Sequence, residues 1–262
     1  MLCGWAGIKL VEGAKLPVSR WTSFAIYAIG GAALIGPMGA RMASAQPMRG
    51  GTLRVAQAHG STTDSMDPGS WENDFTILQA HTRNNYLTEI APDGSLVPEL
   101  AESWEASADA ATWTFTIRSG VQFHSGHILT AEDVVASLRH HMGEDSTSAA
   151  APIVAPITDM RIDGMNVIFT LASGNADFPY LLSDYHILIH PAGMIEESIA
   201  KGIGTGGYKV ESFEPGVKME ASKYENHYKD DACFFDGIEA LAITDTNARM
   251  NAMATGQVDA IN

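Results

Sequence analysis

The stretch GIGTGGY, residues 202–208, is the first candidate for chemistry, because its glycines follow the G-x-G-x-x-G spacing of a dinucleotide-binding loop. Such a loop must follow a strand and open a helix, so that the helix N-terminus meets the pyrophosphate. Here residues 194–201 are predicted to be a helix and residues 208–213 a strand. Because this order is reversed, we interpret the run as a structural crossover and expect no nucleotide site.

Four histidines are candidates for metal binding. His124 and His127 lie in a predicted loop, not one turn apart on a helix. His140 and His141 are adjacent and therefore point to different faces of a predicted helix. We interpret all four as surface or capping histidines, and expect no metal and no other cofactor.

Catalysis has no recognisable arrangement in this sequence. There is no G-x-S-x-G motif. Glu132 and Asp133 are paired carboxylates, but they follow Thr130 at the start of a predicted helix, where Asp133 completes a capping box. Both acids also favour the positive end of the helix dipole. We therefore expect a protein that is not an enzyme.

Composition narrows the class of partner. The 262 residues are 45% hydrophobic and 18% charged, which is typical of a folded globular chain. The formal net charge of −15 makes DNA, RNA and anionic lipid poor partners, because like charges repel.

The N-terminal segment predicts export. Lys15 and Arg20 precede an uncharged apolar run over residues 21–38, and Ala43-Ser44-Ala45 matches a cleavage signature. We interpret residues 1–45 as a signal peptide cleaved before Gln46, and a retained membrane anchor as the alternative. After cleavage Cys233 would be the only cysteine, so no intramolecular disulfide is expected.

Periodicity and turn signals predict a mixed α/β chain. The expected helices, the last of them capped by Thr246 and closed by Gly256, cover residues 75–87, 131–142, 194–201 and 247–255. The expected strands, with hairpins turning at Asp163-Gly164 and at Glu214-Pro215-Gly216, cover residues 52–56, 112–117, 157–162, 166–171, 186–190, 208–213, 217–221, 238–243 and 258–261.

Four motifs in order carry a resemblance to a known family: VPELAESW at 97–104, WTFTIR at 113–118, GVQFHSG at 120–126 and LTAEDV at 129–134. GTGGY at 204–208 and GQVDAI at 256–261 extend it. The series resembles the oligopeptide/dipeptide (and nickel) class of ABC-transporter solute-binding proteins over residues 50–262. The resemblance implies a type II periplasmic-binding-protein fold, in which two α/β lobes close around a ligand.

The resemblance also implies a domain plan. Residues 46–75 and 201–262 would form the first lobe, and residues 76–200 the extra subdomain of the peptide-binding class. Family members are typically about twice as long, so we expect this chain to end before the second lobe. Gly207 stands where the family usually has proline, which would fix φ and remove a donor.

The resemblance places ligand contacts in the loop after the first strand, where an extended ligand would hydrogen-bond much like an added strand. The expected contacts are Ser61, Thr62, Thr63 and Asp64, and the weaker candidates are Asp184, Tyr185 and His186. A plain surface turn is the alternative for the loop.

The resulting hypothesis is an exported, monomeric, periplasmic protein. It would capture peptides or related small solutes and deliver them to an inner-membrane ABC permease. One alternative is a truncated fragment that binds peptide more weakly than millimolar, because one lobe supplies only half of the contacts. A secreted hydrolase or a receptor ectodomain is a further alternative, without positive support in the sequence.

Overall fold

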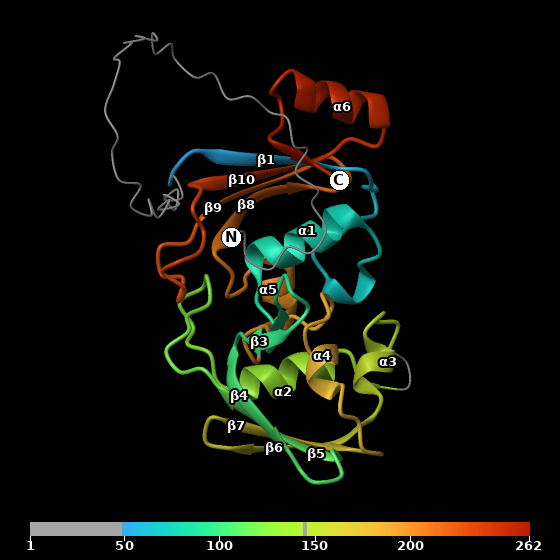
Figure 1. Cartoon of the computed structure of the whole chain (residues 1–262), viewed down its shortest axis with the longest axis vertical. Coiled ribbons are helices and arrows are strands. Elements are labelled where there is room, and N and C mark those ends of the chain that lie inside the picture. Colours follow the sequence, from blue (N-terminus) through green and yellow to red (C-terminus); the bar gives the residue numbers. More distant parts are fainter. Residues whose placement is uncertain (1–48, 144–145) are drawn as a thin grey trace, which may run out of the picture.

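The computed structural model describes residues 49–143 and 146–262. It contains two sheet regions, one above the other in Figure 1. The predicted signal peptide and its cleavage site lie outside the described residues. Among the described residues, no helix combines the length and apolarity needed to cross a membrane.

The upper region is a five-stranded sheet in the order β11-β1-β10-β9-β8. Its strands are β1 Thr52–Gln57, β8 Tyr208–Glu214, β9 Lys218–Lys223, β10 Gly237–Ala242 and β11 Ala260–Ile261. Strand β1 runs parallel to β10 and to β11, whereas β8, β9 and β10 are antiparallel. The first strand of the chain therefore lies between two strands formed almost at its end.

Two helices cover opposite faces of this sheet, as Figure 1 shows. On one face, α1 (Asp74–Arg83) packs Phe75 and Leu78 against Val55 of β1. On the other, α6 (Thr246–Ala254) packs Ala252 against Ala56. Successive β1 side chains thus enter separate cores, as the period of two along a strand requires.

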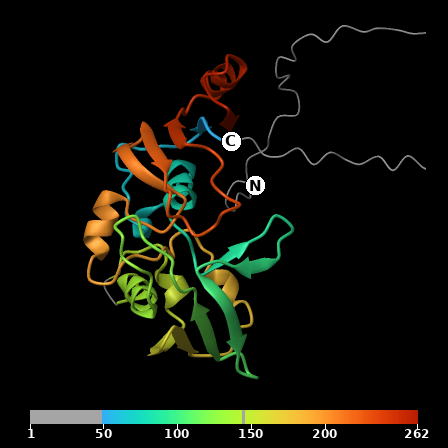
Figure 2. The same cartoon turned by 90° about the vertical axis from the view of Figure 1, so that its left-hand side faces the viewer.

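The lower region is a four-stranded antiparallel sheet in the order β4-β5-β7-β6. Its strands are β4 Ala101–Ala106, β5 Thr112–Ile117, β6 Ile157–Asp163 and β7 Asn166–Leu171. Its helices are α2 Ala131–His140, α3 Ala151–Val154 and α4 Phe178–Leu181. A hairpin of β2 (Thr88–Ile90) and β3 (Leu96–Pro98) stands out from the body in Figure 2.

The alternation predicted for TWTFTI is confirmed, because Trp113, Phe115 and Ile117 are buried and the three threonines are only partly so. Phe115 is the centre of the aromatic core. Its ring meets those of Phe169 and Phe178 edge to face, at centroid distances of 5.5 and 6.2 Å.

The capping box of α2 is confirmed, and Asp133 does more than cap. Its carboxylate accepts from the backbone N–H of Thr130 at 2.7 Å and from that of Ala192 at 2.6 Å. His127 Nε2 also lies 3.1 Å away from it. Asp133 is fully buried, and a buried charge is costly unless it is hydrogen-bonded. The several donors around its carboxylate meet this requirement. His127 thus contacts the capping carboxylate of α2, whereas His141, which was expected to be a surface or capping residue, is buried.

Three predicted elements are corrected. Residues 186–190 form no strand: the backbone N–H of His186 donates to Asp184 and that of His190 to Ser137 Oγ, so side chains replace a neighbouring strand. The first helix ends at Arg83 rather than at residue 87. The cap of α6 is Asp245, not Thr246, because the Asp245 carboxylate accepts from Ala248 N at 2.7 Å.

The domain division remains a prediction, with one structural indication about its position. Helix α1 contacts β8 and β10, and the rings of Phe75 and Phe213 stack 6.1 Å apart. This packing joins α1 to the five-stranded sheet and favours a division after Arg83 rather than at residue 75.

The glycine run is confirmed as a crossover, since α5 (Ile195–Lys201) precedes it and β8 follows it. His124 Nε2 donates to the carbonyl of Gly206 at 2.9 Å, and His124 Nδ1 accepts from Gly204 N–H at 3.2 Å. Gly206 N–H in turn donates to the carbonyl of Arg83 at 2.9 Å. The loop therefore ties the end of α1 to the lower region, and no pyrophosphate is needed to explain its glycines.

Close packing explains three of these glycines. A Cβ at Gly204 would lie 2.1 Å from the Arg83 carbonyl oxygen, and one at Gly206 would lie 2.4 Å from the Arg83 carbonyl carbon. At Gly207 a Cβ would lie 1.8 Å from Cys233 Sγ. Cys233 thus fills the space that a proline ring at position 207 would need, which accounts for the departure from the family pattern.

A lysine joins the β2–β3 hairpin to the segment before β10. Lys229 Nζ lies 3.0 Å from Glu89 and also contacts the buried Glu99. Burial raises the pKa of Glu99 to about 7, although Lys229 opposes the shift. Two acids and one cation thus meet where the two regions touch.

Candidate functional site

An open hollow of about 580 Å³ lies where β1 and β10 end. The chain leaves these parallel strands for opposite faces of the sheet, toward α1 and α6. In open α/β sheets, ligands bind outside the carboxyl ends of strands at such a switch point. The residues that line the hollow come from the two strand–helix loops and the two helix starts: Ala58, His59, Gly60, Ser61, Asn73, Thr244, Thr246 and Arg249.

The structure brings four predicted ligand residues into one turn. Ser61 N–H donates to Asp64 at 2.8 Å, and the hydroxyls of Ser61 and Thr63 lie 2.7 Å apart. Ser61, Thr62 and Thr63 are exposed, and only Ser61 of the four lines the hollow. Ligand contact by this turn remains a prediction.

Tyr185 is not brought to the same place. Its ring packs at the edge of the cluster of Trp71, Ala80, Tyr86 and Leu188, and 4.0 Å from the ring of His186. It does not line the hollow. A role for Tyr185 in ligand contact would therefore require a second contact region.

The start of α1 is held firmly at the rim of the hollow. Asn73 caps the helix by accepting from Phe75 N and Thr76 N, and its amide donates to Asp64 at 2.7 Å. The Asp74 carboxylate is hydrogen-bonded to His59 Nδ1 at 2.9 Å and accepts from Asn262 Nδ2 at 2.7 Å. The polar rim is thus preorganised by contacts within the chain.

Of the residues that line the hollow, only Ser61 was a predicted ligand contact, and Arg249 is the buried charged residue that sequence reasoning missed. Its side chain is buried, and its NH1 group donates to the carbonyls of Ile243 at 2.7 Å and Thr244 at 3.1 Å. Its Nε has no hydrogen-bond partner among the described residues. The only available signal was its position one turn into a helix that follows a strand, and sequence alone does not show that such a residue is buried.

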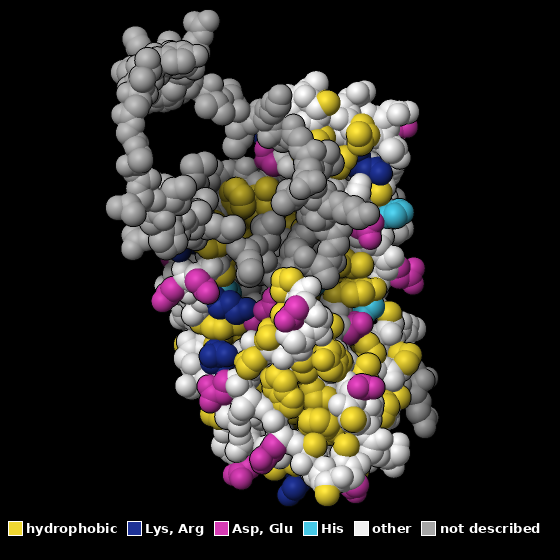
Figure 3. All heavy atoms as spheres, in the orientation of Figure 1, with side chains coloured by type: hydrophobic (Ala, Val, Ile, Leu, Met, Phe, Trp, Pro, Cys, Tyr) yellow, Lys and Arg dark blue, Asp and Glu magenta, His cyan; other side chains and the backbone are white. Residues whose placement is uncertain are grey.

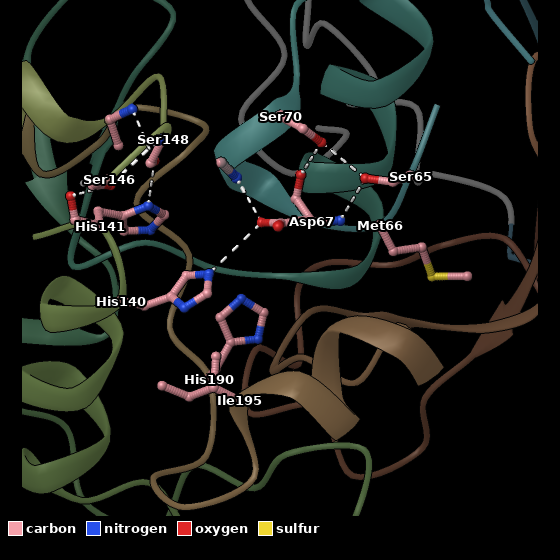
Figure 4. A network of polar contacts seen from close by, with 12 residues as sticks. Ser65, Met66, Asp67, Ser70, His140, His141, Ser146, Ser148, His190 and Ile195 are labelled. Atoms are coloured by element: carbon pink, nitrogen blue, oxygen red, sulfur yellow. Dashed lines mark hydrogen bonds and ion pairs between the residues drawn. The ribbon is translucent and has the colours of Figure 1, made fainter. Parts of the chain in front are cut away.

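His140 and His141, the other two candidates for metal binding, have partners within the protein, as Figure 4 shows. His140 lies 3.7 Å from Asp67, which raises the pKa of His140 and lowers that of Asp67. His141 Nδ1 lies 2.7 Å from Ser148 Oγ. Within residues 49–143 and 146–262, no three His, Cys, Asp or Glu side chains gather as a metal site would require.

Relatives of this chain are binding proteins. It is 27% identical to di/tripeptide-binding protein 1 of Pseudomonas aeruginosa, over 84% of this chain and 46% of that one. It is 28% identical to a glutathione-binding protein of Salmonella paratyphi A, over 78% of this chain and 41% of the relative. The chain thus spans less than half the length of these relatives.

Solved structures show the same fold. A periplasmic binding protein of A. tumefaciens R10, in complex with agropinic acid, matches with a TM-score of 0.75 and 26% identity, over 80% of this chain and 43% of that one. A Helicobacter pylori periplasmic binding protein in complex with a peptide matches with a TM-score of 0.74 at 22% identity, over 82% of this chain and 47% of that one, which supports the fold alone. The fold is therefore that of the type II periplasmic binding proteins, with one lobe and the extra subdomain among the described residues.

The family model for bacterial extracellular solute-binding proteins, family 5 Middle, matches residues 95–262, which is more than half of the sequence. It includes all four motifs in full, the glycine crossover and α6. The resemblance expected from the motifs is thereby confirmed, and the chain belongs to the family 5 bacterial extracellular solute-binding proteins.

Proposed function

We propose that this chain is the solute-binding component of an ABC transporter, exported to the periplasm. It captures a peptide or a related small solute at the hollow and delivers it to a membrane permease without chemistry. The observation that carries the proposal is the hollow at the carboxyl ends of β1 and β10 in a family 5 fold. Relatives named for di/tripeptides and glutathione support the class of solute.

The affinity of this chain alone is expected to be weaker than millimolar. Periplasmic-type closure buries the ligand from two sides, and the hollow supplies contacts from one. Ser61 and the exposed backbone of its turn would provide the first of those contacts.

Backbone NMR of the chain, titrated to high concentration with short peptides, tests the proposal. We expect shifts confined to residues 58–61, 73 and 244–249. Thr244→Trp, which fills the hollow, should abolish them. Asn247→Trp is the matched control, because Asn247 is exposed in the first turn of α6, three residues after Thr244, and does not line the hollow. If no peptide shifts the hollow residues, or if both tryptophan variants behave alike, the proposal is wrong.

A further inference from the structure

Arg249 is a buried cation whose charge is not matched. Its side chain keeps 7% of its exposure, and both hydrogen bonds that it makes go to backbone carbonyls through NH1. Among the described residues it forms no ion pair, and its Nε has no partner. Burial of a charge is costly unless it is paired, so such a cation at the wall of a hollow indicates that an anion completes it.

The acids near the hollow are already engaged elsewhere. The Asp64 carboxylate accepts hydrogen bonds from Ser61 N and from the Asn73 amide. The Asp74 carboxylate is hydrogen-bonded to His59 and Asn262. The Asp245 carboxylate accepts from Ala248 N. Each is stabilised where it lies by these donors. None of them pairs with Arg249, so the arginine stays available to a ligand.

The two helices beside the hollow contribute a positive field at this point. The N-termini of α1 and α6 both end at the hollow, since Asn73 and Thr246 line it. Each N-terminus carries the positive end of a helix dipole. Asn73 and Asp245 already cap the free N–H groups, so the helices contribute field and Arg249 contributes the direct donor.

We infer that the hollow binds a carboxylate group of the solute, with the Arg249 guanidinium as its counter-charge. The guanidinium delocalises its charge over all three nitrogens, and charge-assisted hydrogen bonds to a carboxylate are among the strong ones. The hydroxyls of Thr244 and Thr246 lie in the same wall and offer further donors. This inference rests on the proposed function and adds to it the charge of the group that the hollow selects.

The test compares Ala-Ala with Ala-Ala amide, which differ in one negative charge. NMR titration of the chain should show the free acid binding about tenfold more tightly, a difference of about 1.4 kcal/mol. The Arg249 Nε–H resonance should shift with the free acid and not with the amide. Ala-Glu amide, and acetate alone, tell whether a side-chain carboxylate or any carboxylate serves as well as the C-terminus.

Arg249→Gln should remove the preference for the free acid, so that acid and amide bind with equal affinity, and Arg249→Lys should keep most of the preference. Arg54→Gln is the matched control, because Arg54 is a surface cation of the same sheet that pairs with Asp259 at 3.0 Å. If Arg249→Gln does not fold, the Nε–H shift of the unmodified chain decides. Equal affinities for acid and amide, with shifts in the hollow, would overturn this inference and leave the proposed function standing. Absence of any hollow shift would overturn both.

Discussion

The two sheet regions differ in where they place their polar groups. In the four-stranded region the aromatic rings of Phe115, Phe169 and Phe178 fill a single core, and the buried charge of Asp133 is matched by several donors. In the five-stranded region the strand ends open into a polar hollow, and the buried Arg249 lacks an acidic partner among the described residues. This difference in how buried charges are matched supports the proposal that the ligand binds at the upper region.

Exposed apolar side chains occur in both regions. Figure 3 shows apolar side chains gathered over the lower part of the molecule, on the face that it presents. Ile90, Ile128, Ile162 and Tyr180, all in or beside the lower region, keep 40% or more of their exposure. In the upper region Val217 and Met250 are as exposed, so the two regions differ in their buried polar groups rather than in exposed apolar residues.

The largest effect is expected from breaking the aromatic core. Phe115→Ala should lower the free energy of unfolding by about 4 kcal/mol, because it leaves a cavity among four neighbouring rings. Native-state hydrogen exchange should accelerate more in β5 and β7 than in β1 and β10. Phe115→Leu is the milder control, and equal acceleration in both sheets would show that the regions do not differ in this way.

The joint between the regions comes next. Gly207→Ala should cost about 2 kcal/mol through overpacking against Cys233 Sγ. Cys233→Gly should rescue it, since glycine removes the sulfur and suits the positive φ of 55° at that position. Thermal unfolding of the single and double variants measures this, and an unrescued double variant would contradict the explanation given for Gly207.

A pH dependence should arise at the same joint. Burial lowers the pKa of His124 to about 4, below its usual 6.5, so the folded state resists a proton that the unfolded state accepts. Stability is therefore full above pH 6.5 and is lost as pH falls toward 4. His124→Gln should cost about 1.5 kcal/mol at pH 7. The variant should also make the denaturation midpoint depend less on pH between pH 7 and 4. An unchanged pH dependence of the midpoint would contradict the lowered pKa of His124.

The smallest effect is expected at the helix beside the hollow. Asp245→Ala should cost about 1 kcal/mol, because the carboxylate caps α6. Thr246→Ala is the comparison that tests the corrected cap, and it should cost only a few tenths of that. Urea denaturation of the two variants measures the difference, and a larger loss for Thr246→Ala would restore the cap predicted from sequence.

Local signals in the sequence predicted much of the fold. The alternation of Trp113, Phe115 and Ile117, the Asp163-Gly164 turn and the Thr130–Asp133 box each depend on neighbours within a few residues. The failures depend on distant ones. Residues 186–190 look like a strand, but a serine of α2 takes the place of a strand partner.

The candidate site was less predictable, for the same physical reason. Ser61 follows a predicted strand and could be found. Arg249 is a candidate only because the fold buries its charge, and Gly207 is required only because the fold places Cys233 against it. Neither relation has a signature in local spacing.

The order of strands also constrains the kinetics of folding. Thr52 of β1 pairs with Gly237 of β10, and Val55 pairs with Ala260 of β11, so β1 must wait for partners that lie far away in the sequence. Closing so long a loop costs entropy before any contact repays it, and folding slows as contacts become less local. The lower region, whose strands pair between residues 101 and 171, can assemble first. We therefore expect the hollow to form after the lower region, once β1 is enclosed on both sides.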